Sequence, residues 1–160
     1  MKVKDFLWRA TLALKTGWSR EIVQAITSKE EGDFYRKTGL YEDRVNGRPV
    51  LKNPLVDSQI DDDNCSNTWY GKEHPSYCGW TNSDLIGEGY PPHDEVGDTI
   101  ELHHIGQHPD SPLAELTWRQ HMGNSRLLHH YGTESEIDRP EFDTQRSSYW
   151  LNRKNNTFQL

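Results

Sequence analysis

Long hydrophobic runs are absent from this sequence. No apolar stretch approaches the roughly 20 residues that a membrane-spanning helix needs, so we expect no membrane segment. The N-terminus mixes Lys, Asp and Trp and lacks the apolar core of a signal peptide, which predicts that none is present. Export would then depend on another route, such as carriage on a larger protein.

Cysteine is scarce, because Cys65 and Cys78 are the only two. Two free buried thiols are the simplest interpretation, and one disulfide is the alternative. A zinc site that combines both with His74 would lack the close Cys-x-x-Cys spacing of most structural zinc sites. The sequence leaves the state of this pair open.

Apolar residues are also few. The hydrophobic fraction is 32%, and the mean hydropathy is -0.96. Aromatic residues partly compensate, at 11% with six Trp, because one Trp buries much more surface than one Val. Disordered chains are poor in aromatic residues. The 160 residues therefore predict one folded domain with a thin core and long loops.

The net charge of -7 argues against a protein that handles nucleic acid. Its distribution softens that objection. Residues 1–30 carry six basic and three acidic side chains, residues 31–100 carry six and fourteen, and residues 101–160 carry six and eight. A bound divalent metal would make its own site locally positive. The charge weakens a nucleic-acid function without excluding it.

Several segments have clear local patterns. Residues 3–27 place apolar side chains at three- and four-residue steps, which predicts one or two helices. Asn46-Gly47, between two β-prone runs, indicates a hairpin, and Pro140 marks the start of a final helix over residues 141–154. The region between the hairpin and residue 99 is irregular and loop-rich, with aromatic side chains at Trp69, Tyr70, Tyr77 and Trp80.

Residues 99–131 predict a strand–strand–helix unit. The first strand alternates apolar and polar residues and ends at Gly106, and a short second strand follows. Thr117 and Gln120 then form a capping box that starts a helix, and Gly132 suits the position just after its end. With the flanking helices, this unit predicts an α+β fold.

Histidines are concentrated in this unit. Eight are present in the chain, and six of them fall between positions 103 and 130. Neutral imidazole is the commonest nitrogen ligand for Zn, Ni or Mn, so a metal site is the economical explanation. A histidine-rich interface or a pH-sensitive surface is the alternative.

The chain contains the strings Ile-Glu-Leu-His-His-Ile-Gly-Gln at 100–107 and Pro-Leu-Ala-Glu-Leu-Thr at 112–117, followed by His121 and Leu128-His129. Together these residues closely resemble the LHH branch of the HNH/endonuclease VII superfamily. The resemblance extends over roughly residues 33–154. Further matching blocks lie at Gly39-Leu40, residues 45–49, Thr81-Asn82, residues 89–92 and residues 135–150.

The resemblance implies a nuclease domain with a ββα-metal finger, of a kind often found at the C-termini of bacterial polymorphic toxins and met by a cognate immunity protein. It also implies roles for the histidines. His103 should be a metal ligand, His104 the general base, and His121 the second ligand. Adjacent residues of a strand point to opposite faces, so both His103 and His104 can serve one site only if the strand ends or bends near Gly106.

Two candidate site residues, Glu101 and His129, leave alternatives open. Glu101 shares a strand face with His103 and could orient that imidazole in the active site or form a surface salt bridge. His129 lies about 80° from His121 on a regular helix, so its ligation depends on Gly123 and Asn124 loosening the helix. His108 is expected to face solvent, and His130 to be structural or exposed.

The loop between the two strands departs from the HNH pattern. The middle asparagine of a typical HNH motif has no clear match, because the aligned residues are Asp110-Ser111-Pro112. That asparagine usually braces the loop, so a different residue must brace it here. Phosphate contacts could come from arginines around the finger, although each could equally form a surface salt bridge: Arg119, Arg126, Arg139 and Arg146.

The sequence thus predicts a helical segment at residues 1–30 and a nuclease domain at residues 31–160, with the finger at about 99–131. We expect hydrolysis of phosphodiester bonds, preferably in DNA and without sequence preference, with one divalent ion (Mg, Mn, Ni or Zn). An RNase on the same scaffold and a non-enzymatic zinc-stabilised binding module are the alternatives. The resemblance implies a bacterial toxin that is secreted or delivered within a larger protein and acts in the cytoplasm of a target cell.

Overall fold

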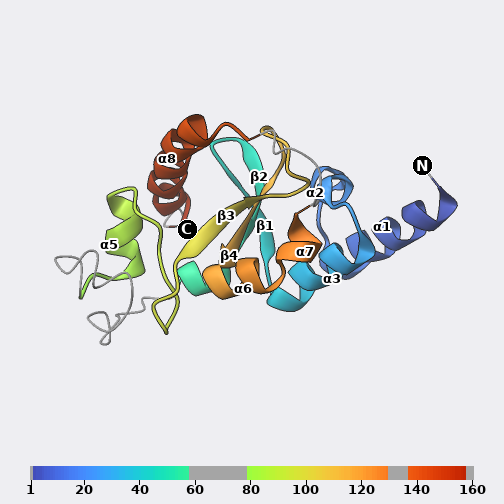
Figure 1. Ribbon diagram of the computed structural model, residues 1–160, viewed down its shortest axis with the longest axis horizontal. Helices are drawn as coiled ribbons and strands as arrows, with labels where there is room; N and C mark the ends of the chain where they lie inside the picture. The colour runs from blue at the N-terminus through green and yellow to red at the C-terminus, as the bar shows by residue number, and fades with distance from the viewer. Residues whose placement is uncertain (1, 58–78, 130–136, 158–160) are drawn as a thin grey trace.

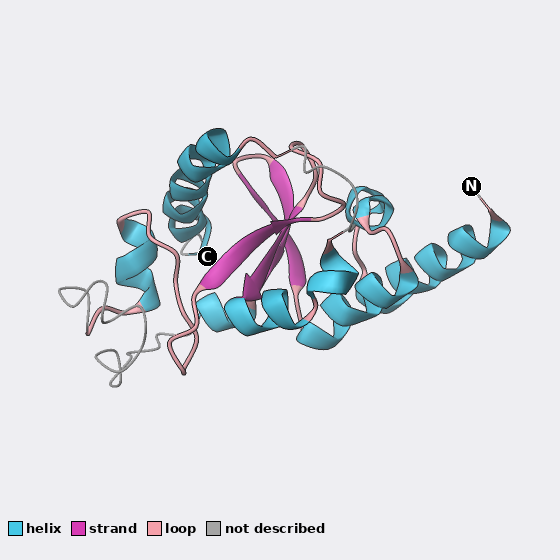
Figure 2. Cartoon of the chain, in the orientation of Figure 1, coloured by secondary structure: helices cyan, strands magenta, loops and turns pink. Residues whose placement is uncertain are grey.

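The computed structural model describes residues 2–57, 79–129 and 137–157, with side chains up to Arg153. A four-stranded sheet lies at its centre, with helices on both faces (Figures 1 and 2). The described elements are α1 (Val3–Thr16), α2 (Arg20–Ala25), α3 (Lys29–Thr38), β1 (Tyr41–Val45), β2 (Arg48–Lys52), η1 (Pro54–Asp57), α5 (Asn82–Gly87), β3 (Ile100–His104), β4 (Leu113–Thr117), α6 (Trp118–Gly123), α7 (Ser125–Leu128) and α8 (Arg139–Thr157).

The sheet joins two antiparallel hairpins. Its strand order is β1-β2-β4-β3, in which β1 with β2 and β3 with β4 are antiparallel and β2 with β4 is parallel. The predicted turn at Asn46-Gly47 is confirmed, since both residues have positive φ, at 55° and 74°, as a type I′ turn requires. In the second hairpin, His103 is paired with Ala114 and His104 with Leu113.

Two apolar clusters cover the two faces of the sheet. On one face, Leu12 of α1, Ile22 of α2, Tyr35 of α3 and Leu128 of α7 belong to the cluster that includes Ile105. On the other, Ile86 of α5 and Phe142 and Trp150 of α8 pack over alternate residues of the strands, which include Ile100, Leu102 and Leu113. Helices from before residue 30 therefore share a core with the finger, and the division at residue 30 stays a prediction.

The N-terminal helices begin and end where the sequence indicates. Residues 3–27 contain two helices, as expected, and Gly17 ends the first in the left-handed conformation at φ 73°. The Ser19 side chain caps the second by accepting from the amide of Ile22. The helix α3 was not predicted. Its cap is Ser28, whose side chain accepts from the amide of Glu31.

The helix after β4 differs from the expected one. The capping box of Thr117 and Gln120 is confirmed, with both reciprocal hydrogen bonds present. The prediction of a single helix up to residue 131 is wrong. The helix is interrupted at Asn124, and the second piece, α7, ends at Leu128. Several residues discussed above lie outside the described part of the chain: Cys65, Trp69, Tyr70, His74, Tyr77, Cys78, His130 and Gly132.

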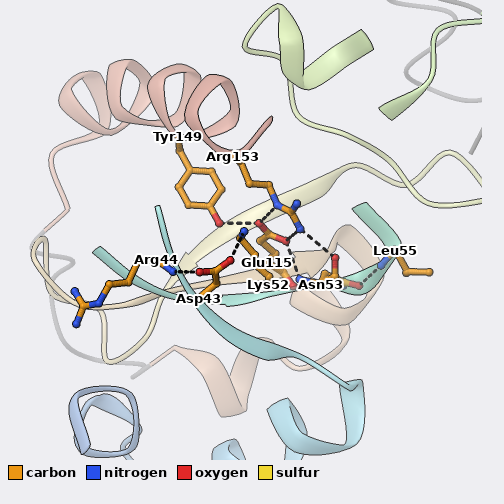
Figure 3. Close-up of polar contacts among 8 residues, drawn as sticks. All are labelled: Asp43, Arg44, Lys52, Asn53, Leu55, Glu115, Tyr149 and Arg153. Atoms are coloured by element: carbon orange, nitrogen blue, oxygen red, sulfur yellow. Dashed lines mark hydrogen bonds and ion pairs between the residues drawn. The ribbon is translucent and has the colours of Figure 1, made fainter. Parts of the chain in front are cut away.

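A buried polar network fastens α8 to the sheet (Figure 3). The Glu115 carboxylate of β4 is fully buried. It accepts from the Tyr149 hydroxyl and from Nε of Arg153, both at 2.7 Å, and from the Asn53 amide at 2.7 Å. A buried charge needs a partner and further hydrogen bonds, and this carboxylate has both.

No helix among the described residues is long and apolar enough to cross a membrane.

Candidate metal centre and active site

Three imidazoles meet where β3 lies against α6 and the end of α7. His103, His121 and His129 each place one ring nitrogen within 4.8 Å of the other two. Their ring centroids are 5.0 to 5.3 Å apart. His103 is buried, and the other two are partly buried. The predicted ligand set is therefore brought together from a strand, a helix and a loop.

The break in the helix places His129. On a continuous helix it would lie off the face of His121, but Asn124 interrupts the helical phase. His129 itself has extended backbone, with φ -117° and ψ 136°. The predicted loosening at Gly123 and Asn124 is therefore what allows this third imidazole to reach the others. Ser125, itself a poor ligand, lies with its Oγ 3.3 Å from Nδ1 of His129.

The three nitrogens fit one metal ion. Nε2 of His121 lies 3.2 Å from Nε2 of His129. Two imidazole nitrogens bound tetrahedrally at roughly 2.0–2.1 Å from one zinc ion would be about 3.3 Å apart. Neutral imidazoles are good ligands for Zn, Ni, Cu and Fe. The donor set and the spacing of His121 and His129 thus match a transition-metal site, and three protein ligands leave the fourth tetrahedral position to substrate or water.

Glu101 contacts a different histidine from the one that the sequence suggested. Its Oε2 lies 2.5 Å from Nδ1 of His121, whereas the sequence pattern paired it with His103. The strand face was right, because Glu101 and His103 both point toward α6. His121 approaches from that helix and meets the carboxylate first. A carboxylate on Nδ1 fixes the tautomer and leaves Nε2 for a metal.

His104 points to the other face of the sheet. Its ring lies 4.5 Å from that of Phe142 in α8, centroid to centroid, and its side chain is buried. Burial lowers the pKa of His104 to about 4, with further lowering by the positive charges of Arg48 and Arg139. The imidazole is therefore neutral at physiological pH. The structure does not bring it into contact with the three clustered imidazoles.

Arg48 braces the loop that joins β3 to β4. Its Nε donates to the Ser111 carbonyl at 2.7 Å, and its Nη2 donates to the Pro109 carbonyl at 2.5 Å. This guanidinium thus does the work expected of the missing HNH asparagine, from a strand 63 residues away. The absent asparagine indicated that a brace was needed. Nothing local in the sequence could identify it as Arg48.

The loop itself begins with a sharp turn. Gly106 has φ 82° and Gln107 has φ 60°, and the amide of Gln107 donates to the carbonyl of His104 at 3.0 Å. The strand therefore ends at His104, as the position of Gly106 predicted. His108, which follows Gln107 in this loop, is exposed, as expected.

The four arginines proposed to bind phosphate differ in their surroundings. Arg119 forms an ion pair with Asp98 at 2.7 Å, which matches the surface salt bridge given as the alternative. Arg146 pairs with Asp143 and lies over the Phe142 ring at 5.2 Å. Arg126 and Arg139 are exposed. The positive charge of Arg139 helps to lower the pKa of His104. Of the four arginines, Arg139 is therefore the one whose charge acts on a candidate site histidine.

Residues 81–156 match the model of a protein family described as LHH, a nuclease of the HNH/ENDO VII superfamily with conserved LHH. The match spans the finger, the three clustered imidazoles and most of α8. Neither a curated protein nor a solved structure matches the chain.

Proposed function

Through residues 81–156 this chain belongs to the LHH nucleases of the HNH/ENDO VII superfamily, which are phosphodiester hydrolases, and on that premise we propose a metal-dependent endonuclease that cleaves DNA with little sequence preference. The observation that carries the proposal is the convergence of His103, His121 and His129 within 4.8 Å. Three neutral imidazoles at this spacing could share one divalent ion, and imidazole is a common metal ligand.

His103, His121 and His129 would hold the ion through ring nitrogens, with Glu101 and Ser125 orienting the last two. A divalent ion there supplies charge neutralisation for the phosphate and the departing 3′ oxygen. An all-imidazole set favours Zn or Ni over Mg and Mn, which prefer oxygen ligands. The chain's own contribution is to fix the ligands on three separate elements.

His104 is proposed as the base that takes a proton from the attacking water. Its support is the match to the family's LHH string and its position next to His103 at the end of β3. Because the His104 ring packs on Phe142, this role requires substrate to bind across the end of the strand, where both faces are reachable. Arg48 and Arg139 lie near enough to shift the pKa of His104 and would attract a phosphate to the same place.

The test is plasmid degradation with Mg²⁺, Mn²⁺, Ni²⁺ or Zn²⁺ by the wild type and single alanine variants. We expect His103→Ala and His121→Ala to lose both metal binding and cleavage. His104→Ala should keep metal binding, measured by calorimetry, and lose cleavage by about 100-fold or more. The matched control is His108→Ala, which removes an exposed histidine of the loop between β3 and β4. This variant should behave as the wild type.

The outcomes separate the competing functions. Full cleavage by His104→Ala would show that this residue only packs against α8. Activity that persists in EDTA on RNA, with none on DNA, would replace the DNase by a metal-free RNase. Metal binding by the wild type without cleavage of either nucleic acid would leave a metal-stabilised binding module.

We further propose that the nuclease acts as a bacterial toxin or effector in the cytoplasm of a target cell, delivered within a larger protein and neutralised by an immunity protein. The family resemblance supports this role. Expression of the wild type in a bacterium should then stop growth and degrade the chromosome, whereas the His104→Ala variant should be tolerated. Normal growth with active enzyme present would argue for a housekeeping or defence nuclease instead.

A further inference from the structure

A basic hollow lies between α1 and α3, outside the segment that matches the nuclease family. It encloses about 360 Å³ and is lined by both helices. Five of its lining side chains are cations and one is an anion, Asp33. The chain as a whole has a net charge of -7, so this concentration of positive charge is local and opposite to the rest. The five cations are Lys4, Lys15, Lys29, Arg36 and Lys37.

Neighbouring carboxylates neutralise only part of this charge. Asp33 pairs with Lys29 at 3.6 Å and with Arg36 at 4.0 Å. Lys4, Lys15 and Lys37 form no ion pair with any residue that the structure describes, and all three are exposed. Cations held close together without counter-ions repel each other. An anionic ligand that spans the hollow would relieve that repulsion.

The shape of the hollow suits a chain of phosphates. Lys4 and Lys15 lie on one side of α1, and eleven residues of helix put their Cα atoms about 16 Å apart. That distance is about half of one turn of duplex DNA, whose full turn is roughly 34–36 Å along the axis, so the two lysines can contact different phosphates of one duplex. Trp8, partly buried between the two lysines, adds an apolar surface.

The hollow is close to the three clustered imidazoles. α3 contacts α7, and α1 contacts α3, so the helices follow one another along one side of the molecule from α6 to α1 (Figure 1). Leu12 and Tyr35 share a core with Leu128, which directly precedes His129. One or two helix diameters of about 10–12 Å therefore separate the hollow from the proposed cleavage site. A duplex of two turns would reach both.

We propose that this α1–α3 hollow binds the phosphate backbone of the nucleic acid substrate beside the cleavage site. The proposal rests on the nuclease function proposed above and assigns a role to the N-terminal helices. Binding there is electrostatic and independent of base sequence, because only phosphates are contacted. It also explains how an acidic protein can hold a polyanion, since the charge is concentrated where the substrate lies.

The test compares two double charge reversals in the full chain. Lys4→Glu/Lys15→Glu alters the hollow, and Lys2→Glu/Arg20→Glu makes the same change in net charge at exposed positions that do not line it. Binding of a fluorescent 30-base-pair duplex is measured by anisotropy in EDTA at several KCl concentrations. We expect the first pair to weaken binding at least tenfold and to reduce the slope of log K against log salt by about 2. The control pair should change affinity less than threefold and leave the slope unaltered.

Cleavage assays separate this proposal from the nuclease function. The first pair should raise KM for plasmid with kcat preserved, and hydrolysis of bis(p-nitrophenyl) phosphate, which is too small to span the hollow, should be unchanged. Loss of duplex binding in a protein that cleaves nothing would support the hollow and sink the nuclease. Cleavage by a wild type whose two double variants bind duplex alike would sink the hollow. Duplex binding that survives while binding of polyglutamate is lost would also overturn it, in favour of an acidic protein partner.

Discussion

The carboxylate of Glu101 lies 2.5 Å from Nδ1 of His121, so one strand residue determines which nitrogen of a helix residue faces the other two clustered imidazoles, His103 and His129. A carboxylate only accepts hydrogen bonds, which places the proton on Nδ1 and the lone pair on Nε2. That Nε2 lies 3.2 Å from Nε2 of His129. Glu101 is thus a positioning residue for the proposed ligand His121 and is not itself proposed as a metal ligand.

Replacing Glu101 with Gln should weaken metal binding. The amide can still contact Nδ1, but it can present either its oxygen or its nitrogen to the ring and so does not enforce one orientation. Such partners of a ligating histidine are worth about 10- to 100-fold in metal affinity. Competition with a chromophoric chelator measures the change. Glu88→Gln, at an exposed glutamate, is the control and should bind as the wild type. Equal affinity in all three proteins would mean that the contact does not orient His121.

Replacing Arg48 with Ala should reduce cleavage while leaving metal affinity intact. The variant loses the two bonds to the Ser111 and Pro109 carbonyls, and displacement of a loop by about 1 Å can cost up to about 100-fold in rate. Arg48→Lys should recover only part of the activity, because an ammonium cannot reproduce the planar fork. The measurements are kcat/KM on plasmid and calorimetric metal affinity.

Arg44 offers the matched control for Arg48. It lies in the same hairpin, and its ion pair with Glu21 at 3.0 Å is exposed on both sides, so Arg44→Ala should have little effect. If Arg48→Ala cleaves normally, the loop holds its shape without this brace. If it loses metal as well as activity, Arg48 supports the fold as a whole and not the loop alone.

What the sequence could predict here depends on how local the cause is. The strand end at Gly106 and the capped helix carrying His121 follow from contacts within a few residues, and both are confirmed. The partner of Glu101 and the brace by Arg48 depend on elements 20 and 63 residues away, which no periodicity can identify. His129 is intermediate, because Gly123-Asn124 signalled a weak helix but not where the chain would go next.

The buried network around Glu115 should control stability. Glu115→Ala leaves the fully buried Arg153 guanidinium without its carboxylate, and breaking such a pair costs about 3–5 kcal/mol. The double variant Glu115→Ala/Arg153→Met should lose less than the sum of the two single losses, because the stranded charge is gone. Denaturant unfolding gives the free energies. Asp143→Ala, which breaks the exposed pair with Arg146, should cost less than about 1 kcal/mol. Strict additivity in the double variant would show that the pair is not coupled.

Gly47, in the turn between β1 and β2, and Gly106, just after β3, allow backbone strain to be separated from steric contact. Gly47 and Gly106 both have positive φ, but a Cβ on Gly47 would meet nothing within 4 Å, whereas one on Gly106 would lie 2.8 Å from the carbonyl oxygen of Ala25. Gly47→Ala should therefore cost only the strain of about 1–2 kcal/mol. Gly106→Ala should cost more, because either the end of α2 or the end of β3 must move. Movement of β3 would shift His103 and lower metal affinity, while movement of α2 would lower the unfolding free energy alone. Chemical denaturation together with metal titration distinguishes the two, and equal losses of stability in both variants would show that the Ala25 carbonyl yields without resistance.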